Sequence, residues 1–483
     1  MGNKTAHWQT CPDCQGRGKK SRRLRKKVRR AYQNALDKFE KAGENGEIPK
    51  RPRGHQDSCV NCSGSGLTPS ANPPTPDKEN YPHVAIIGAG IGGVALAVAC
   101  MHRQIPYTLY EWDKSFDDRS QGYGLTLQQA SKAIEGLGIF SLNEGVISTR
   151  HVVHTTEGKE IGEWGIRKWL DADNEDFTKR TNVHIARQSL RLALIEQLGG
   201  ENKVQWGHQL VDLKTNSSKK IELTFQENGK TTHANADLVV GADGIRSSVR
   251  RLMIGDDISP LRYLDCIVIL GICALKDLKE IESPLLDSAT VFQTANGHER
   301  MYMMPYSADA IMWQFSFPMT EKAAKELSDQ GAGALKAEAQ QRADWHFPIP
   351  QILSATQESK ISGYPVYDRE LLQQELLEKG GPISLIGDAA HPMSPFKGQG
   401  ANQALLDSLA LARGISMGCR AQSQWRESGI RKSVLTEFET EMLARSASKV
   451  EDSAEAAKFL HSDVVLHEGD EPRGRSLKRN NKK

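Results

Sequence analysis

The sequence lacks a long apolar run and an N-terminal export signal. Its longest apolar stretch, Cys266 to Leu275, is about half the length that a membrane-spanning helix needs, so we expect no transmembrane segment. The first residues, MGNKTAHWQTCPDC, lack the apolar core of a secretory signal, and Ala6 stands where the myristoylation pattern places Ser or Thr. We therefore expect a cytoplasmic protein.

The sequence also lacks a marked charge excess. Its 63 Lys and Arg against 60 Asp and Glu leave a net charge of +3 over 483 residues, which gives no reason to expect nucleic acid as a partner. Basic residues do cluster from Lys19 to Arg30 and in the tail RGRSLKRNNKK. An import signal or an anionic contact is one reading of these runs. Without interleaved aromatic residues, they fit a solvated helix and a disordered tail better.

Cysteine is scarce and unevenly placed. Four of the eight cysteines form two close pairs near the N-terminus, and the others stand apart at 100, 266, 273 and 419. This layout favours metal binding over a disulfide framework.

Composition divides the chain into a Cys/Gly/basic module at 1–67, a Pro-rich linker at 68–82, a long α/β region at 83–460 and a basic disordered tail at 461–483. In the module, apolar residues at helical spacing predict one amphipathic helix from Ser21 to Ala42, between the two cysteine pairs. The α/β region opens with the strand HVAIIG, a helix from Gly93 to Gln104 and the strand PYTLYE. Further strands are predicted at 221–226, 236–243, 267–275, 290–295, 300–306 and 311–317, the last group antiparallel.

Three glycines, Gly88, Gly90 and Gly93, lie between the first strand and its helix. Glycines at this spacing allow a tight turn and bring backbone amides and a helix N-terminus close to a pyrophosphate. Glu111 ends the next strand, where a carboxylate accepts hydrogen bonds from an adenosine ribose. A turn used only for helix packing is the alternative, but it leaves Glu111 unexplained.

Two later segments repeat the order of strand, acid and helix. The first of these segments starts at Ala236, contains Asp243 and Gly244, and reads ADLVVGADGIRSSVRR. The second starts at Ser384 and reads SLIGDAAHPMSPFKGQGANQALLDSLALA. It contains Asp388, followed by a flexible turn from Gly398 to Asn402 that caps a helix. Unpaired amides at the positive end of that helix suit an electron-rich ring oxygen.

Together the three segments resemble the single-component aromatic-hydroxylase class of FAD-dependent monooxygenases, which includes p-hydroxybenzoate hydroxylase and the tetracycline-inactivating monooxygenases. The resemblance covers residues 83 to 420, through the patterns DGxxSxxR and GDAAHxxxPxxGxGxNxxxxD. It implies an α/β fold in which a Rossmann-like FAD-binding domain, about 83–260 and 375–420, carries an inserted antiparallel substrate sheet at 262–320 and helices at 421–460.

The resemblance also assigns cofactor contacts. Gly88, Gly90 and Gly93 would hold the FAD pyrophosphate, Glu111 the ribose and Asp388 the ribityl or pyrophosphate region. Asp243 would serve FAD and nicotinamide use, and Pro392 and Gly398 would border the isoalloxazine. The full cofactor set is Gly88, Gly90, Gly93, Glu111, Arg119, Arg187, Asp243, Gly244, Asp388, Gly398, Gly400, Ala401 and Asn402. For Arg119 and Arg187, a surface charge is the alternative.

The implied reaction uses NAD(P)H and O2. FAD carries the electrons, and a flavin hydroperoxide hydroxylates a small aromatic or phenolic compound, so we name no side chain as catalytic. His391 is as consistent with a positional role as with a catalytic one. In the segment 262–318, an apolar roof that keeps the site dry would be formed by Trp313, Phe315, Tyr302 and several methionines. Simple sheet core is the alternative for these residues, so we name none of them as a substrate ligand.

A fourth motif is independent of the others. Cys11 with Cys14 and Cys59 with Cys62 each open a CxxCxGxG repeat, and two such knuckles can place four thiolates around one zinc ion. The repeats resemble the cysteine-rich region of DnaJ-type chaperones, which has four, so chaperone activity does not follow. A redox pair and a disordered arm are the alternatives.

Two other functions stay open at this point. One is an RNA- or protein-binding protein that uses the zinc module beside a non-catalytic flavin fold. The other is an FAD reductase without oxygen insertion. The sequence does not specify the substrate, the choice of NADH or NADPH, or the oligomeric state.

Overall fold

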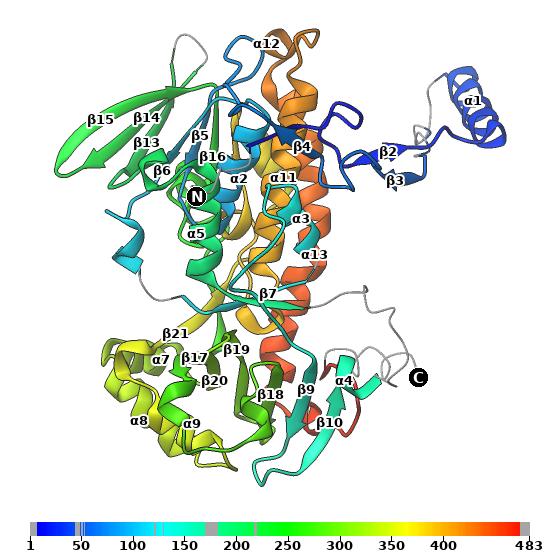
Figure 1. Cartoon of the computed structure of the whole chain (residues 1–483). Coiled ribbons are helices and arrows are strands. Elements are labelled where there is room, and N and C mark those ends of the chain that lie inside the picture. The colour runs from blue at the N-terminus through cyan, green and yellow to red at the C-terminus, as the bar shows by residue number, and fades with distance from the viewer. Residues whose placement is uncertain are drawn as a thin grey trace.

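The computed structural model describes residues 7–43, 49, 52, 54–119, 122–128, 130–169, 182–216 and 220–473. It has two main lobes, one around a parallel sheet and one around an antiparallel sheet, with the long helix α13 (Thr436–Phe459) running along both (Figure 1). The N-terminal module extends from the side of the first lobe.

The first lobe is built on a five-stranded sheet with strand order β12-β6-β5-β16-β22, in which all neighbours are parallel. Three of its strands are buried at every position, as expected for apolar strands covered on both faces. This sheet confirms the predicted Rossmann-like part of the fold. Its strands are β5 (Val84–Ile87), β6 (Tyr107–Tyr110), β12 (Val204–Gln205), β16 (Leu238–Gly241) and β22 (Ile383–Leu385), and its helices include α2 (Ile91–His102), α5 (Arg187–Leu198) and α11 (Gly400–Gly418).

Two small antiparallel sheets accompany the parallel one. One is a meander in which β14 pairs with both of its neighbours, and the other has the order β7-β11-β8. Their strands are β13 (Gln209–Thr215), β14 (Ile221–Glu227), β15 (Lys230–Ala236), β7 (Gly124–Leu127), β11 (Val183–Ala186) and β8 (Val146–Ile147). Shorter helices are α3 (Ser131–Glu135), α4 (Ile166–Trp169), α6 (Ser248–Ile254), α10 (Gln374–Glu378) and α12 (Trp425–Ser428).

The second lobe contains a seven-stranded sheet, β10-β9-β18-β19-β20-β17-β21. It is wider than the segment 262–320 from which we expected it, because β9, β10 and β21 come from outside that segment. Its strands are β9 (Arg150–His154), β10 (Glu160–Trp164), β17 (Arg262–Ala274), β18 (Thr290–Ala295), β19 (Arg300–Ser307), β20 (Ala310–Pro318) and β21 (Ile361–Asp368), and its helices are α7 (Glu321–Asp329), α8 (Ala332–Arg342) and α9 (Ile349–Ala355).

The two faces of this sheet have different partners. Trp313 and Phe315 belong to a core that includes Leu335 of α8 and Ile352 of α9. Met312 belongs to a different buried cluster, on the face toward the first lobe. Successive side chains of a strand point to opposite faces, so only one half of the predicted roof residues faces a possible substrate.

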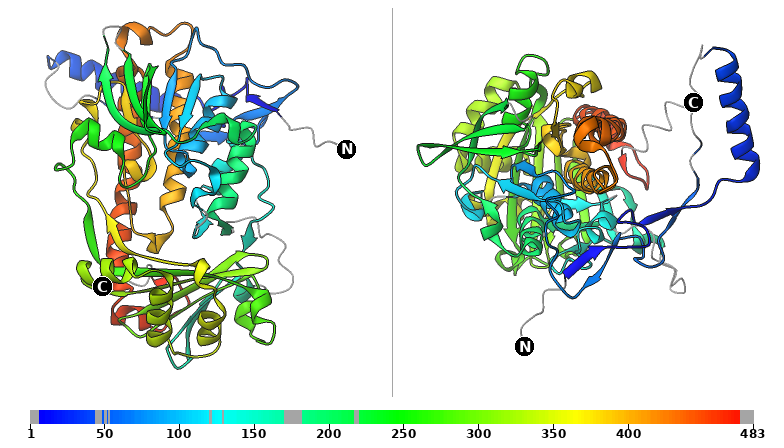
Figure 2. Two further views of the ribbon diagram at one scale, coloured as in Figure 1. Left: turned by 90° about the vertical axis from the view of Figure 1, so that its left-hand side faces the viewer. Right: turned by 90° about the horizontal axis from the view of Figure 1, so that it is seen from above.

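In the N-terminal module, β1 (His7–Thr10) pairs with β4 (Leu67–Ser70), and β2 (Lys19–Ser21) pairs with β3 (Gln56–Ser58). The helix α1 (Lys26–Lys41) is shorter than predicted and has no buried residue. It lies away from both lobes in Figures 1 and 2.

The tail differs from our expectation of disorder from residue 461. The structure places 461–473 against the second lobe, where buried Arg473 donates hydrogen bonds to the carbonyls of Val465, Gly469 and Ile161. Residues 474–483 lie outside the described residues. Among the described helices, none is long and apolar enough to cross a membrane.

Candidate cofactor and substrate site

The glycine loop joins β5 to α2 at a point where three backbone segments meet. A Cβ atom at Gly93 would lie 1.8 Å from the carbonyl oxygen of Gly88, and one at Gly88 would lie 2.6 Å from that of Ala242. Gly90 caps α2, whose N-terminus has no side-chain cap and no acidic residue in its first turn. The amides at this end are therefore available to an anion such as a pyrophosphate.

Glu111 follows β6 and is nearly buried. Its Oε2 atom accepts a hydrogen bond from the Ala89 amide at 2.6 Å, and its Oε1 atom accepts one from the Asp113 amide at 3.1 Å. The carboxylate thus fixes the glycine loop. Its contact with a ribose stays a prediction.

Helix α5 brings two arginines to this loop. Arg187 begins the helix, and its Nη2 atom would lie 3.6 Å from a Cβ at Gly90. Arg191, one turn later, is buried and donates from Nε to the Ala89 carbonyl at 2.7 Å. Sequence reasoning missed Arg191, although its spacing of four residues from Arg187 places both on one helix face. Arg119 ends a short 3-10 turn, and its side chain lies outside the described residues.

Asp243 acts within its own segment. Its Oδ2 atom accepts from the amides of Ser248 at 2.7 Å and Val249 at 3.2 Å, at the start of α6. Burial raises the pKa of Asp243, against these hydrogen bonds. Next to it, Gly244 has φ +80° and nothing within 4 Å of a Cβ position, and Arg250 donates from Nη1 to the Ala389 carbonyl at 3.0 Å. The segment that begins at Ala236 therefore holds the segment that begins at Ser384 in place. The cofactor roles of Asp243 and Gly244 stay predictions.

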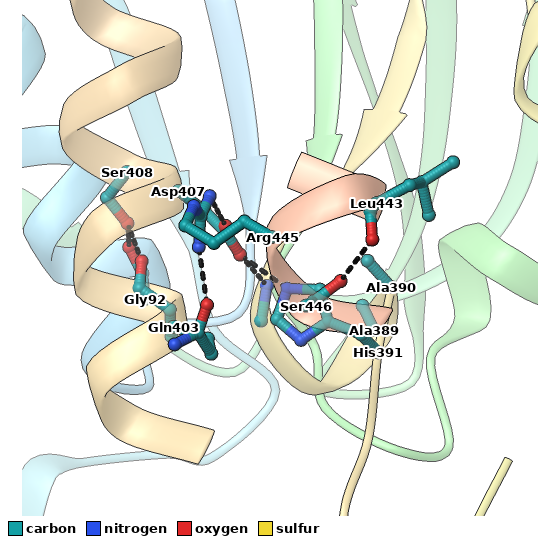
Figure 3. A network of polar contacts seen from close by, with 12 residues as sticks. Gly92, Ala389, Ala390, His391, Gln403, Asp407, Ser408, Leu443, Arg445 and Ser446 are labelled. Carbon is teal, nitrogen blue, oxygen red and sulfur yellow. Dashed lines mark hydrogen bonds and ion pairs between the residues drawn. The ribbon is translucent and has the colours of Figure 1, made fainter. Parts of the chain in front are cut away.

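A buried ionic network surrounds the third motif (Figure 3). Asp407 accepts from the Gly387 amide at 2.8 Å and contacts Nε2 of His391 at 2.7 Å, and its other oxygen pairs with Arg445 of α13 at 2.8 Å. Asp388 is exposed toward a cavity. The protein atoms packed around its carboxyl group raise the pKa of Asp388 against the opposing charges of His391 and Arg187.

Asn402 fastens the loop before α11 to β7. Its Oδ1 atom accepts from the amides of Gln128 and Ala130, and its Nδ2 atom donates to the carbonyls of Thr126 and Gly398. Gly400, Ala401 and Asn402 form the first turn of α11 and not the flexible turn that we predicted. The N-terminal end of this long helix opens onto the cavity.

The cavity has a volume of about 650 Å³ and lies between the two lobes. Asp388, Pro392, Gly398, Gly400 and Ala401 line it from the first lobe. The opposite wall is mostly apolar or aromatic and includes Leu270, Val291, Tyr302, Met304, Met312, Tyr364 and Val366. The structure therefore brings the predicted flavin-binding residues opposite the cavity face of the antiparallel sheet.

Arg300 is the one arginine on the sheet wall of this cavity among the described residues. It is 5% exposed, its Nε donates to Oε1 of Gln293 at 3.1 Å, and it forms no ion pair with any described carboxylate. Burial lowers its pKa to about 10. Gln314, also on the wall, has a buried Nε2 without a hydrogen-bond partner. These strand residues carried no sequence signal, because their side chains become neighbours only through strand pairing.

The four N-terminal cysteines form a second site. Their sulfur atoms lie within 4.8 Å of one another, with Cys11 and Cys59 at 4.0 Å and Cys14 and Cys62 at 3.7 Å. Four thiolates at tetrahedral zinc bonding distance are about 3.8 Å apart. The amides of Gly18 and Gly66 donate to the sulfurs of Cys14 and Cys62 at 3.2 Å, so the final glycine of each repeat supports a thiolate.

Comparison with known proteins supports the same interpretation. Residues 81–428 match the family described as "FAD binding domain". Phenazine 1,6-dicarboxylic acid hydroxylase of Lysobacter antibioticus is 28% identical over 348 residues, which cover 68% of this chain and 81% of that protein. 6-Hydroxynicotinate 3-monooxygenase of Pseudomonas fluorescens is 24% identical over 346 residues, which cover 69% of this chain and 82% of that protein.

Solved structures show the same fold. HpxO of Klebsiella pneumoniae, in complex with FAD and uric acid, superimposes with a TM-score of 0.64 at 20% identity, covering 82% of this chain and 92% of that one. A tetracycline destructase superimposes with a TM-score of 0.56 at 18% identity, covering 83% of this chain and 94% of that one. The chain therefore belongs to the FAD binding domain family and is an FAD-dependent monooxygenase, with its four-cysteine module preceding the matched segment.

Proposed function

We propose that the protein hydroxylates a small aromatic compound that carries a carboxylate or a similar anionic group, using NAD(P)H and O2. The observation that carries this proposal is the position of Arg300, a buried cation on the cavity wall without a carboxylate partner in the described structure. A buried charge is costly unless it is paired, so an anionic substrate group is its natural partner.

The neighbours of Arg300 support an acceptor group as ligand. Gln293 uses its Oε1 to hold the guanidinium, which leaves its amide nitrogen as a donor. Tyr302 pairs with both Gln293 and Gln314 across the strands, so the three side chains form a row on the cavity face. A carboxylate placed here receives charge-assisted hydrogen bonds from Arg300 and further donors from the amides.

The rest of the cavity suits an aromatic ring. Leu270, Met304 and Met312 form an apolar surface opposite Asp388 and the N-terminus of α11. Bound FAD supplies hydride acceptance from the nicotinamide and the activation of oxygen. The protein residues orient the ring and exclude water from it. Both relatives named above have names that specify an aromatic acid, which agrees with this substrate class.

We further propose that Cys11, Cys14, Cys59 and Cys62 hold one structural zinc ion. The sulfur distances fit tetrahedral thiolate coordination, and all four side chains are buried. His55 is exposed and is not needed as a ligand.

The test uses the purified full-length chain. We expect a bound-flavin spectrum and NAD(P)H oxidation with O2 uptake that aromatic carboxylic acids stimulate more than their uncharged amides, with a product heavier by one oxygen. Arg300→Gln should raise KM for the acids about 10- to 100-fold and leave KM for the amides nearly unchanged, since a charged hydrogen bond contributes roughly 1.5–3 kcal/mol.

Each failure has a separate meaning. If the chain takes up no flavin after FAD is added, the proposed monooxygenase activity is refuted, and a binding role for the N-terminal module is favoured. NAD(P)H oxidation without an oxygenated product would favour a reductase. Equal responses to acids and amides, in the wild type and in Arg300→Gln, would refute the anionic substrate.

A further inference from the structure

Two arginines of the FAD-binding lobe, one buried and one half-buried, face the cysteine module. Arg103 follows the last residue of α2 and is 2% exposed, and its Nη2 atom donates to the Gly16 carbonyl at 3.5 Å. Arg413 lies in the second half of α11 and donates from Nε to the same carbonyl at 2.9 Å. Gly16 stands between Cys14 and Gly18 in the first repeat.

Arg413 also reaches the second repeat. Its Nη2 atom donates to the Ser65 carbonyl at 3.3 Å and would lie 3.3 Å from a Cβ atom at Gly18. The guanidinium therefore lies between the two turns that present Cys14 and Cys62. Neither Arg103 nor Arg413 forms an ion pair with any carboxylate in the described part of the chain, and Nε of Arg103 is buried without a partner.

The negative charge of the zinc-loaded cysteine site provides the counter-charge that these arginines lack. Four thiolates carry two more negative charges than one divalent zinc ion neutralises. Two guanidinium groups balance that excess. A guanidinium that is withdrawn from water without a counter-charge destabilises the fold, whereas one beside a zinc-tetrathiolate group is compensated.

The two arginines lie on the helices that face the cofactor at their other ends. Helix α2 starts at the Gly90 cap beside the pyrophosphate loop, and α11 starts at the cavity. The two helices pack against each other, and Ser408 of α11 donates to the Gly92 carbonyl at 2.7 Å. A constraint on their C-terminal halves therefore acts on the pair that holds FAD.

We propose that the zinc-loaded module is an electrostatic clamp, in which Arg103 and Arg413 recognise the anionic zinc-tetrathiolate group and fasten the C-terminal halves of α2 and α11. This inference rests on the proposed zinc site. Contacts that do not depend on charge balance, such as the Trp8 and Phe140 rings at 4.5 Å, complete the interface.

The experiment measures zinc affinity in the full-length, FAD-loaded chain by competition with a chromophoric chelator, after metal analysis has given the zinc content. Arg103→Gln and Arg413→Gln should each weaken zinc binding about tenfold, and the double variant more. Arg413→Lys, which keeps the charge, should lie nearer the wild type. Arg420→Gln is the matched control, because Arg420 donates to Gln15 of the same module at an exposed position.

A second measurement does not require any variant. Zinc removal from the wild type should lower the melting temperature by several degrees and speed the release of FAD, followed by its fluorescence. Absence of stoichiometric zinc would refute the metal site and the clamp together. With one zinc bound, arginine variants that match Arg420→Gln, or FAD release that ignores zinc removal, would overturn the clamp and leave the zinc site standing.

Discussion

The Nε2 atom of His391 lies 2.7 Å from Oδ2 of Asp407, and neither side chain is exposed to solvent. The second oxygen of Asp407 pairs with Arg445 at 2.8 Å, so the pair joins the third cofactor motif to α11 and α13. The Nδ1 atom of His391 is buried without a partner. His391 therefore acts first as part of a buried ionic network that shapes the flavin side of the cavity.

This network predicts a specific pH dependence of stability. Burial favours the neutral imidazole, but Asp407 holds the pKa of His391 above its ordinary value, against Arg445. A pKa that is higher in the folded state stabilises the protein below about pH 6.5, and the effect is lost as pH rises through the folded-state pKa. His391→Gln should therefore lose about 3–5 kcal/mol at pH 6 and less at pH 9, as measured by urea unfolding.

The contribution of Asp407 to stability has the opposite pH dependence. Burial raises the pKa of Asp407, but His391 and Arg445 outweigh it and hold that pKa below its ordinary value, so its contribution is lost only as pH falls through the folded-state pKa. Both contributions are present near pH 6. A loss in His391→Gln that stays constant or grows toward pH 9 would contradict the network.

A Gly93→Ala substitution should abolish FAD binding or folding. The added methyl group would lie 1.8 Å from the Gly88 carbonyl, and that backbone cannot move without distorting the loop. Flavin content after purification and FAD titration measure the effect. Gly333→Ala in α8 is the control, because its nearest neighbour would be a Glu358 side chain at 3.4 Å. Normal flavin binding by Gly93→Ala would disprove the loop assignment.

Asn402→Ala should destabilise the protein by at least about 3 kcal/mol, because it removes four hydrogen bonds to backbone groups of β7, of the segment after β7 and of the Gly398 turn. FAD affinity should fall with it. Urea unfolding and FAD titration give the two quantities, with the exposed Asn143→Ala as control. An Asn402→Ala variant as stable as this control would refute the role of Asn402 in holding β7 to α11.

The two faces of the antiparallel sheet should respond differently to truncation. Trp313 is fully buried and donates from Nε1 to Thr356 at 2.9 Å, so Trp313→Ala should cost about 3–5 kcal/mol of stability with KM nearly unchanged. Met312→Ala, on the cavity face, should change KM for the aromatic substrate. Steady-state kinetics and unfolding of both variants decide this. The reverse pattern would show that the faces are wrongly assigned.

Local patterns in the sequence determined the glycine loop, the strand and helix that flank it, and the spacing of the two cysteine pairs. They also determined the family and the FAD cofactor, because the three motifs combine turn residues, apolar strands and acids within short segments. Such signals depend only on neighbouring residues, so they can be read without a structure.

Only the tertiary structure decided which distant side chains meet. Arg300 and Gln314 share a wall because β19 and β20 pair in one register, and the period of two sends Met312 and Trp313 to opposite faces. Arg103 and Arg413 look like ordinary helix arginines in the sequence, and Arg473 looks like part of a charged tail. Their contacts with distant segments follow from long-range packing, which depends on the fold of the whole chain and not on local composition.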